Sequence, residues 1–386
     1  MIKKITFGFI IVLLAASVGF FSIAPSYIDR QKNTVTAQVS ITPSAEYNQL
    51  PFVADLHCDA LLWDRDFFEY LDHGHVDLPR MQRSNMAFQA FTIVSKTPRN
   101  MNITSNSDET DQIALLSFAQ LLPPSSWFSI KARALHQCQQ LHDFAKKSEG
   151  AFRVIRNQLE LKQFIADRAN NPTLTAGMLG LEGAHCLENN LSNLREFYDA
   201  GVRYIGLAHF FDNEWAGSAH GIKKGGLSPL GRQLIAKMDS LNIIIDLAHA
   251  STQTISDILQ QTSSPVIVSH TGVKSVCNNQ RNLSDKQLIE IGKRKGLVAI
   301  GLWETAVCGT DAEATAKSMR YVANLIGTDK VALGSDFDGA IRAHFDVTGL
   351  PLIMQALKKE GFNATEIEQM MGGNIRDFLL RNLPIQ

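Results

Sequence analysis

The sequence has few cysteines and no excess of charge of either sign. Its 386 residues include five cysteines, too few for a scaffold held by disulfides, and the odd number leaves at least one cysteine unpaired within a monomer. The 37 Lys and Arg residues are balanced by 38 Asp and Glu residues, for a formal net charge of −1. Such a chain has no general field that would gather nucleic acid or an anionic membrane surface. Substrate choice must therefore depend on local groups.

Domain boundaries are also lacking in the body of the chain. We find no internal repeat and no low-complexity tract. With 45% hydrophobic residues the chain can bury one large core. We therefore predict a single domain over residues 50–386, preceded by a polar linker over residues 26–49. A protein starting near Ser44 is expected to be soluble and active.

The N-terminus differs from everything that follows it. Lys3 and Lys4 precede an almost wholly apolar run over residues 5–25. About 20 apolar residues cross a hydrocarbon core of about 30 Å, which favours an uncleaved signal-anchor over residues 1–25. A cleaved signal peptide is the alternative, because small residues such as Ala24 could serve a signal peptidase. Both interpretations export the body of the chain, and the basic pair favours a cytoplasmic N-terminus.

Short apolar, β-branched runs alternate with amphipathic helical stretches after residue 50, a pattern typical of βα units around a parallel sheet. The eight runs are Phe52–His57, Ala87–Val94, Thr175–Glu182, Val202–His209, Ile243–His249, Val266–His270, Leu297–Leu302 and Val331–Asp336. Eight strands predict an α/β fold of the (β/α)₈ or TIM barrel type. A helical insertion is expected after the second strand, over Gln112–Leu122 and Ile130–Lys147, and two more helices over Leu352–Leu383.

Histidines and acidic residues gather at the carboxyl ends of these strands, where barrels of this type carry their active sites. The marked positions are His57, Asp59, Glu182, His209, His249, His270 and Asp336. A lone histidine at a strand end is more often a hydrogen-bonded structural residue than a metal ligand. Four histidines with three acids are better explained by one shared site, because buried charge is costly unless it is paired or bound to metal.

The residue types favour two metal ions. His57 and Asp59 stand two apart on a strand, so both face the same way and can hold one ion. His249 and His270 would bind a second ion, and Glu182 could bridge the two. Mixed imidazole and carboxylate ligation suits zinc, with manganese or cobalt as substitutes. Such a site could generate a bridging hydroxide and stabilise an oxyanion, which amide hydrolysis requires.

In order and spacing, the chain resembles the membrane (renal) dipeptidase family of amidohydrolase-type barrels from about Phe52 to Leu380. The motifs that carry the resemblance are His57-Cys58-Asp59, His75-Val76-Asp77-Leu78-Pro79-Arg80, Gly180-Leu181-Glu182-Gly183-Ala184-His185, Arg203-Tyr204 through His209, Asp246-Leu247-Ala248-His249, Ser269-His270, Gln280-Arg281-Asn282 and Gly334-Ser335-Asp336-Phe337-Asp338-Gly339. The resemblance implies a binuclear zinc dipeptidase that acts on dipeptides with a free C-terminal carboxylate.

The resemblance also implies roles for single residues. The metal ligands would be His57, Asp59, Glu182, His249 and His270, and the catalytic set Asp336, Glu182 and His209. His209, Arg281 and Asp336 would contact substrate, with Asp336 handling protons. These roles suit the residue types, since a histidine can donate to an oxyanion and an arginine can grip a carboxylate with its planar fork.

The resemblance further implies a disulfide between Cys277 and Cys308. His185 and Asp338, which stand close to the expected ligands in sequence, are expected to support them from behind. Mammalian members carry a C-terminal lipid-anchor signal, whereas this chain has an N-terminal apolar segment and no hydrophobic tail. Together these features indicate a bacterial cell-envelope protein on the periplasmic side, held to the membrane by the N-terminal segment or secreted after cleavage.

Other functions stay open. An N-acyl amino acid deacylase on the same barrel would also need a substrate carboxylate, and a non-catalytic envelope binding protein could keep the fold, since fold alone does not give function. The expected partner is a small peptide. Assembly as a homodimer stays open.

Overall fold

The computed structural model describes residues 18–39 and 41–386. Most of the predicted signal-anchor therefore lies outside the described residues. Residues 18–32 are helical. Among the described residues, no helix has both the length and the apolar character that crossing a membrane requires.

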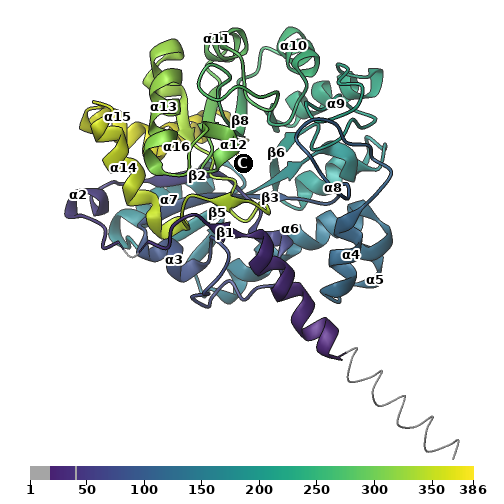
Figure 1. The fold of residues 1–386 in the computed structure, drawn as a ribbon, viewed down its shortest axis with the longest axis horizontal. Coiled ribbons are helices and arrows are strands. Elements are labelled where there is room, and N and C mark those ends of the chain that lie inside the picture. Colours follow the sequence, from purple (N-terminus) through teal and green to yellow (C-terminus); the bar gives the residue numbers. More distant parts are fainter. Residues whose placement is uncertain (1–17, 40) are drawn as a thin grey trace, which may run out of the picture.

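Eight parallel strands form the predicted barrel (Figure 1). They are β2 (Val53–Cys58), β3 (Met86–Ile93), β5 (Thr175–Glu182), β6 (Val202–Gly206), β7 (Ile244–Asp246), β8 (Val266–Thr271), β9 (Leu297–Ile300) and β10 (Val331–Leu333). Each overlaps one of the eight predicted runs, and only β2, β3 and β8 extend beyond their runs, by one residue each. The ring closes between β2 and β10, where Cys58 bridges to Phe337 and the Asp59 amide donates to the Phe337 carbonyl at 2.8 Å. The barrel fold is confirmed.

Every residue of these eight strands is buried. Parallel strands covered by helices read as continuous apolar runs for this reason.

The labelled α-helices that follow the N-terminal helix are α2 (Ala45–Asn48), α3 (Leu78–Arg83), α4 (Gln112–Ala119), α5 (Pro124–Phe128), α6 (Ile130–Lys147), α7 (Gln158–Asn170), α8 (Asn193–Asp199), α9 (Pro229–Ser240), α10 (Thr252–Gln261), α11 (Asp285–Lys293), α12 (Glu304–Val307), α13 (Ala312–Ile326), α14 (Leu350–Lys359), α15 (Ala364–Glu368) and α16 (Asn374–Asn382).

Side-chain caps fix where several of these helices begin. The Ser251 hydroxyl accepts from the Thr254 amide at the start of α10, and Ser284 forms a reciprocal capping box with Gln287 at the start of α11. Such caps satisfy amides that have no partner within the helix. The caps therefore define the residue at which each of these helices begins.

Two regions contain more helices and strands than the sequence predicts. The insertion after β3 contains α5 between its two predicted helices, and β4 (Phe152–Val154) pairs with β5. The C-terminus has three helices where two were expected, because a π-helical turn over Gln369–Gly373 separates α15 from α16. At Gly372 in this turn a Cβ atom would lie 2.1 Å from the Phe52 carbonyl oxygen, so only glycine permits this close approach.

The segment predicted as a linker packs against the barrel instead of spanning solvent. Strand β1 (Thr34–Val35) pairs with β11 (Arg342–Ala343), and the buried Tyr47 hydroxyl donates to the Ser84 carbonyl at 2.9 Å. The Asp29 carboxylate accepts from Arg65 at 2.5 and 2.6 Å. These partners lie far along the chain, which is why a polar composition over residues 26–49 did not reveal them.

Candidate metal centre

The carboxyl ends of the barrel strands open into one cavity of about 770 Å³. Its lining includes six of the predicted site residues, Asp59, Glu182, His209, His249, Arg281 and Asp336. His57 and His270 lie directly behind this lining and are 0% and 1% exposed. The structure therefore brings all eight predicted site residues together, as the shared-site interpretation requires.

One group of ligand atoms surrounds the His57 imidazole. Its Nε2 atom lies 3.4 Å from Asp59 Oδ1, 3.4 Å from Glu182 Oε1 and 3.9 Å from Asp336 Oδ1. His57 is the last residue but one of β2, and Asp59 follows two residues later, so both side chains face the same way. Asp336 comes from the loop after β10, the neighbour that closes the barrel.

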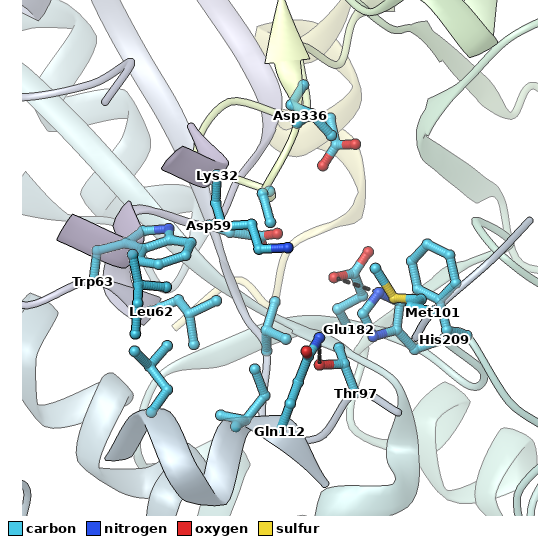
Figure 2. Close-up of a pocket in the computed structure, with 18 of the residues that line it drawn as sticks. Lys32, Asp59, Leu62, Trp63, Thr97, Met101, Gln112, Glu182, His209 and Asp336 are labelled. Atoms are coloured by element: carbon cyan, nitrogen blue, oxygen red, sulfur yellow. Dashed lines mark hydrogen bonds and ion pairs between the residues drawn. The ribbon is translucent and has the colours of Figure 1, made fainter. Parts of the chain in front are cut away.

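A second group forms on the other side of Glu182, at the end of β5. Glu182 Oε1 lies 3.0 Å from His249 Nε2 and 3.4 Å from His270 Nε2. Its Oε2 atom lies 3.2 Å from His209 Nε2 (Figure 2). One carboxylate thus reaches four imidazoles, drawn from both halves of the site.

The donor set fits divalent metal. Three groups of side chains have ligand atoms within 4.8 Å of one another: His57, Glu182 and His270; Glu182, His209 and His249; and His57, Asp59 and Asp336. The buried His57 Nε2 and Asp59 Oδ1 atoms have no hydrogen-bond partner among the described residues. Buried polar atoms without partners are costly, and imidazole nitrogens with carboxylate oxygens are the ligands that zinc and similar ions take.

The pKa shifts that the protein imposes on these residues also favour a bound cation. Burial raises the pKa of Glu182 well above its ordinary value and that of Asp336 to about 8, while it lowers the pKa of His249 and His270 well below theirs. Burial opposes the charge of His57, but the carboxylates of Glu182 and Asp59 raise its pKa to about 10. The cluster holds its carboxylates ionised at little cost only when a cation lies among them.

Backbone strain is concentrated at the same strand ends. His249, Asp336 and Asp338 have φ angles of 59°, 62° and 63°, in the left-handed region. Each costs roughly 1–2 kcal/mol for a residue with a Cβ atom. Gly183, directly after Glu182, has φ of 98°, which favours glycine. The surrounding fold therefore holds His249 and Asp336, which line the cavity, in a strained backbone conformation.

Asp338 and His185, the two residues expected in supporting roles, lie behind the cluster. Asp338 accepts from the His75 amide at 2.7 Å and pairs with Arg65 at 2.8 Å. His185 Nε2 lies 3.1 Å from the Ser95 hydroxyl, and its ring packs against that of Phe211. Neither residue is among the groups whose ligand atoms could share an ion.

Arg281 is 8% exposed and lies in a loop that overlooks the cluster. Its Nη2 atom donates to the His270 carbonyl at 2.8 Å. The Cys277–Cys308 disulfide, which the resemblance implied, is present and ties this loop to the end of α12. Asn279 reinforces the tie by donating to the Thr305 carbonyl at 2.7 Å.

Sequence reasoning missed three residues of the site. The Ser269 hydroxyl lies 3.0 Å from Nδ1 of both His57 and His270, so it links histidines from the two groups. His220 lines the cavity, and its ring lies 5.1 Å from that of His249. Lys32 also lines the cavity. Adjacency to His270 was the available signal for Ser269, whereas Lys32 lies far from every motif.

A (β/α)₈ barrel with imidazoles and carboxylates gathered at its strand ends defines a metal-dependent hydrolase. The model of the membrane dipeptidase family, peptidase family M19, matches residues 47–379. The chain belongs to this family and is a metal-dependent dipeptidase, which confirms the resemblance found in the sequence.

Individual relatives agree with this assignment. Dipeptidase aclJ of Aspergillus oryzae is 28% identical over 348 residues, which cover 84% of this chain and 76% of the fungal protein. A solved metallopeptidase called dipeptidase AC superposes with a TM-score of 0.71 at 24% identity, over 86% of this chain and 98% of its own. A metallopeptidase of Rhodobacter sphaeroides, solved with a phosphinate mimic of the dipeptide L-Ala-D-Ala, gives 0.69 at 24% identity, over 86% and 99%.

Proposed function

We propose that this dipeptidase uses two zinc ions, held by five residues with Glu182 between them. The observation that carries the proposal is that one buried carboxylate reaches imidazoles on both sides, at 3.4 Å from His57 and 3.0 Å from His249. The proposed ligands are His57, Asp59, Glu182, His249 and His270. When bound, two such ions would polarise the scissile carbonyl and activate a water molecule for attack.

The remaining groups of the site would position substrate and move protons. Asp336 is the most exposed of the three acids, with 13% of its side chain accessible, so its carboxylate can accept a proton at Oδ1 and return it to the leaving amine. His209 faces the cavity beside Glu182 and can donate from its imidazole to the substrate carbonyl as negative charge develops.

Arg281 would select substrates with a free carboxylate. Its guanidinium is buried beside the cluster, where a charge-assisted contact is little screened by water. A grip at this place leaves room for about one residue between the carboxylate and the reacting carbonyl, which favours dipeptides over longer peptides. The binding of a dipeptide mimic by the Rhodobacter sphaeroides relative supports a substrate of this size.

The substrate's carboxylate provides the test. A charge-assisted contact contributes about 1.5–3 kcal/mol, so amidating the C-terminus of Ala-Ala, or making Arg281→Ala, should each lower kcat/KM by roughly 10- to 150-fold. Combined, the two changes should lower it little further, because both delete the same contact. Arg281→Lys is the matched variant, since it keeps the charge but loses the planar fork.

The same substrates separate the proposal from its alternative. Equal cleavage of Ala-Ala and its amide by the unchanged enzyme would contradict the role of Arg281. Faster hydrolysis of N-acetyl-alanine than of Ala-Ala would favour an N-acyl amino acid deacylase on the same site.

We also propose that the enzyme works in the cell envelope. The basic pair Lys3 and Lys4 with the apolar run over residues 5–25 supports export, and the Cys277–Cys308 disulfide is of the kind that persists in oxidising compartments. Fractionation of the full chain, with sequencing of its mature N-terminus, distinguishes an anchor from a cleaved signal.

A further inference from the structure

The outer part of the cavity has a different character from the metal cluster. Above the cluster the lining is largely apolar and comes from the turn after β2, from α4 and the loop before it, and from the N-terminal helix; it includes Leu62, Trp63, Ile113, Leu116, Phe20 and Ile28. Among the described residues, Lys32 is the only charged side chain in this outer part. Figure 2 shows its side chain directed into the cavity beside Asp59 and Trp63.

Ion pairs and packing hold the segment that carries Lys32 in place. Asp29 pairs with Arg65, which in turn pairs with Asp338 at 2.8 Å. The Asn33 side chain accepts from the Ala340 amide at 2.9 Å. At the other end of the segment, the Phe21 ring lies 5.3 Å from that of Phe118 in α4, edge to face. Lys32 is thus presented to the cavity from an ordered backbone.

Lys32 differs from its charged neighbours in having no ionic partner. Asp29 pairs with Arg65, and Arg30 pairs with Asp72 at 2.7 Å. Within residues 18–39 and 41–386, Lys32 forms neither an ion pair nor a side-chain hydrogen bond. The nearby carboxylates of Asp59 and Glu182 are assigned to metal in the proposed function. The ammonium group is therefore available to an anion that enters the cavity.

Lys32 lies where the first residue of a bound dipeptide is expected. The Arg281 guanidinium bonds to the His270 backbone, and His270 lies 3.0 Å from His249, on the side of the cluster that also holds His209. Figure 2 places Lys32 across the cavity from His209. A dipeptide with its carboxylate at Arg281 and its scissile bond at the cluster would direct its first residue toward Lys32.

We propose that Lys32 is a specificity-determining residue that binds an acidic side chain on the first residue of the dipeptide. The inference rests on the proposed function, since it takes the orientation of the substrate from Arg281. The apolar surroundings would hold the methylene groups of a Glu or Asp side chain while its carboxylate meets the ammonium group.

Two isosteric pairs of dipeptides test this role. The ratio of kcat/KM for Glu-Ala to that for Gln-Ala should fall roughly 3- to 10-fold in Lys32→Gln, the size expected for a charge contact open to solvent. Lys32→Arg should keep the ratio, and Lys32→Glu should lower it further. The ratio for Ala-Glu to Ala-Gln should change little. Because each ratio compares two substrates on one protein, partial misfolding does not alter it.

Lys162→Gln is the matched control, because Lys162 is an exposed lysine on α7, away from the cavity lining. Raising the ionic strength should weaken the Glu-Ala preference of the unchanged enzyme and leave Lys32→Gln unaffected. An unchanged ratio in Lys32→Gln, or a change confined to the Ala-Glu pair, would overturn the proposal. A wild-type enzyme that cleaves no dipeptide would instead overturn the proposed function.

Discussion

The metal cluster and the outer wall of the cavity are built in different ways. The cluster takes its side chains from the ends of neighbouring barrel strands, as with His57 on β2 and Glu182 on β5. The outer wall comes largely from segments outside the barrel strands, among them the N-terminal helix and α4, which pack together through the rings of Phe21 and Phe118. The barrel therefore positions the groups that carry out the reaction, and the added segments determine which substrates fit the cavity.

The two regions also treat charge differently. Behind the outer wall, outside the cavity lining, Arg65 lies between two carboxylates, those of Asp29 and Asp338, so its buried charge is compensated by the protein itself. In the cluster Asp59, Glu182 and Asp336 share a buried space without an arginine or lysine ion pair among the described residues. The cluster needs an added cation and the wall does not. Substitutions in the cluster should alter metal content, and substitutions in the outer wall should alter substrate preference.

The sharpest test of this division is Glu182→Gln. Because Glu182 is assigned to both ions, we expect loss of metal together with a fall in kcat/KM of roughly 10³-fold or more. Metal content by mass spectrometry and hydrolysis of Ala-Ala measure the two effects. A chelator should abolish activity in the unchanged enzyme, and zinc or manganese should restore it.

Glu69→Gln serves as the control, because Glu69 is exposed and lies outside the cavity lining. Full metal content with a normal rate in Glu182→Gln would remove the assignment of Glu182. Undiminished turnover by metal-free protein would contradict the distinction between cluster and outer wall, since the cluster would then need no cation.

A smaller effect is expected from Ser269→Ala. The Ser269 hydroxyl lies within hydrogen-bond distance of Nδ1 of His57 and of His270, which directs the Nε2 atom of each toward the shared space. Groups that orient metal ligands in this way typically account for 10- to 100-fold in metal affinity, so we expect a loss of about that size. Competition with a chromophoric chelator measures the affinity independently of activity.

Ser95→Ala provides a matched control, because Ser95 bonds to His185, which is not a proposed ligand. Metal affinity should stay near the wild-type value in that variant. Equal affinities in Ser269→Ala and Ser95→Ala would show that Ser269 does not position the ligands.

The sequence was sufficient for most of the barrel and for the cluster. Each of its eight apolar runs coincides with a strand to within a few residues, because burial on both faces leaves a local signal. The polar residues that follow these runs converge because strands of a parallel barrel all end on one side. Whether the predicted ligands bind metal stays a prediction.

What the sequence could not give depends on contacts between distant residues. Residues 26–49 look like a linker because their polar side chains find partners only far away, as in the pairing of β1 with β11. A protein starting near Ser44 would lack both Lys32 and Asp29, so we now expect such a truncation to leave the cavity wall incomplete. The role of Ser269 was hidden for a similar reason, since its second partner, His57, lies 212 residues away.

The smallest effect on activity should come from the disulfide that holds the Arg281 loop. Cys277 and Cys308 are 31 residues apart, and closing a loop of that length contributes about 3–4 kcal/mol to the free energy of unfolding in the chain-entropy model. In the folded enzyme, the Asn279 and Asn282 side chains still bond to the carbonyls of Thr305 and Ala306 at 2.7 and 2.9 Å. The loop should therefore loosen without leaving its place.

We expect the double variant Cys277→Ala with Cys308→Ala to raise KM for Ala-Ala roughly 2- to 5-fold, with little change in kcat and none in metal content, because the disulfide tethers a substrate contact and not a proposed ligand. Reductant should lower the thermal midpoint of the unchanged enzyme but not that of the double variant, which serves as its own control. Loss of metal in the double variant would contradict the division between cluster and wall, since it would show that the loop around Arg281 also holds the cluster together.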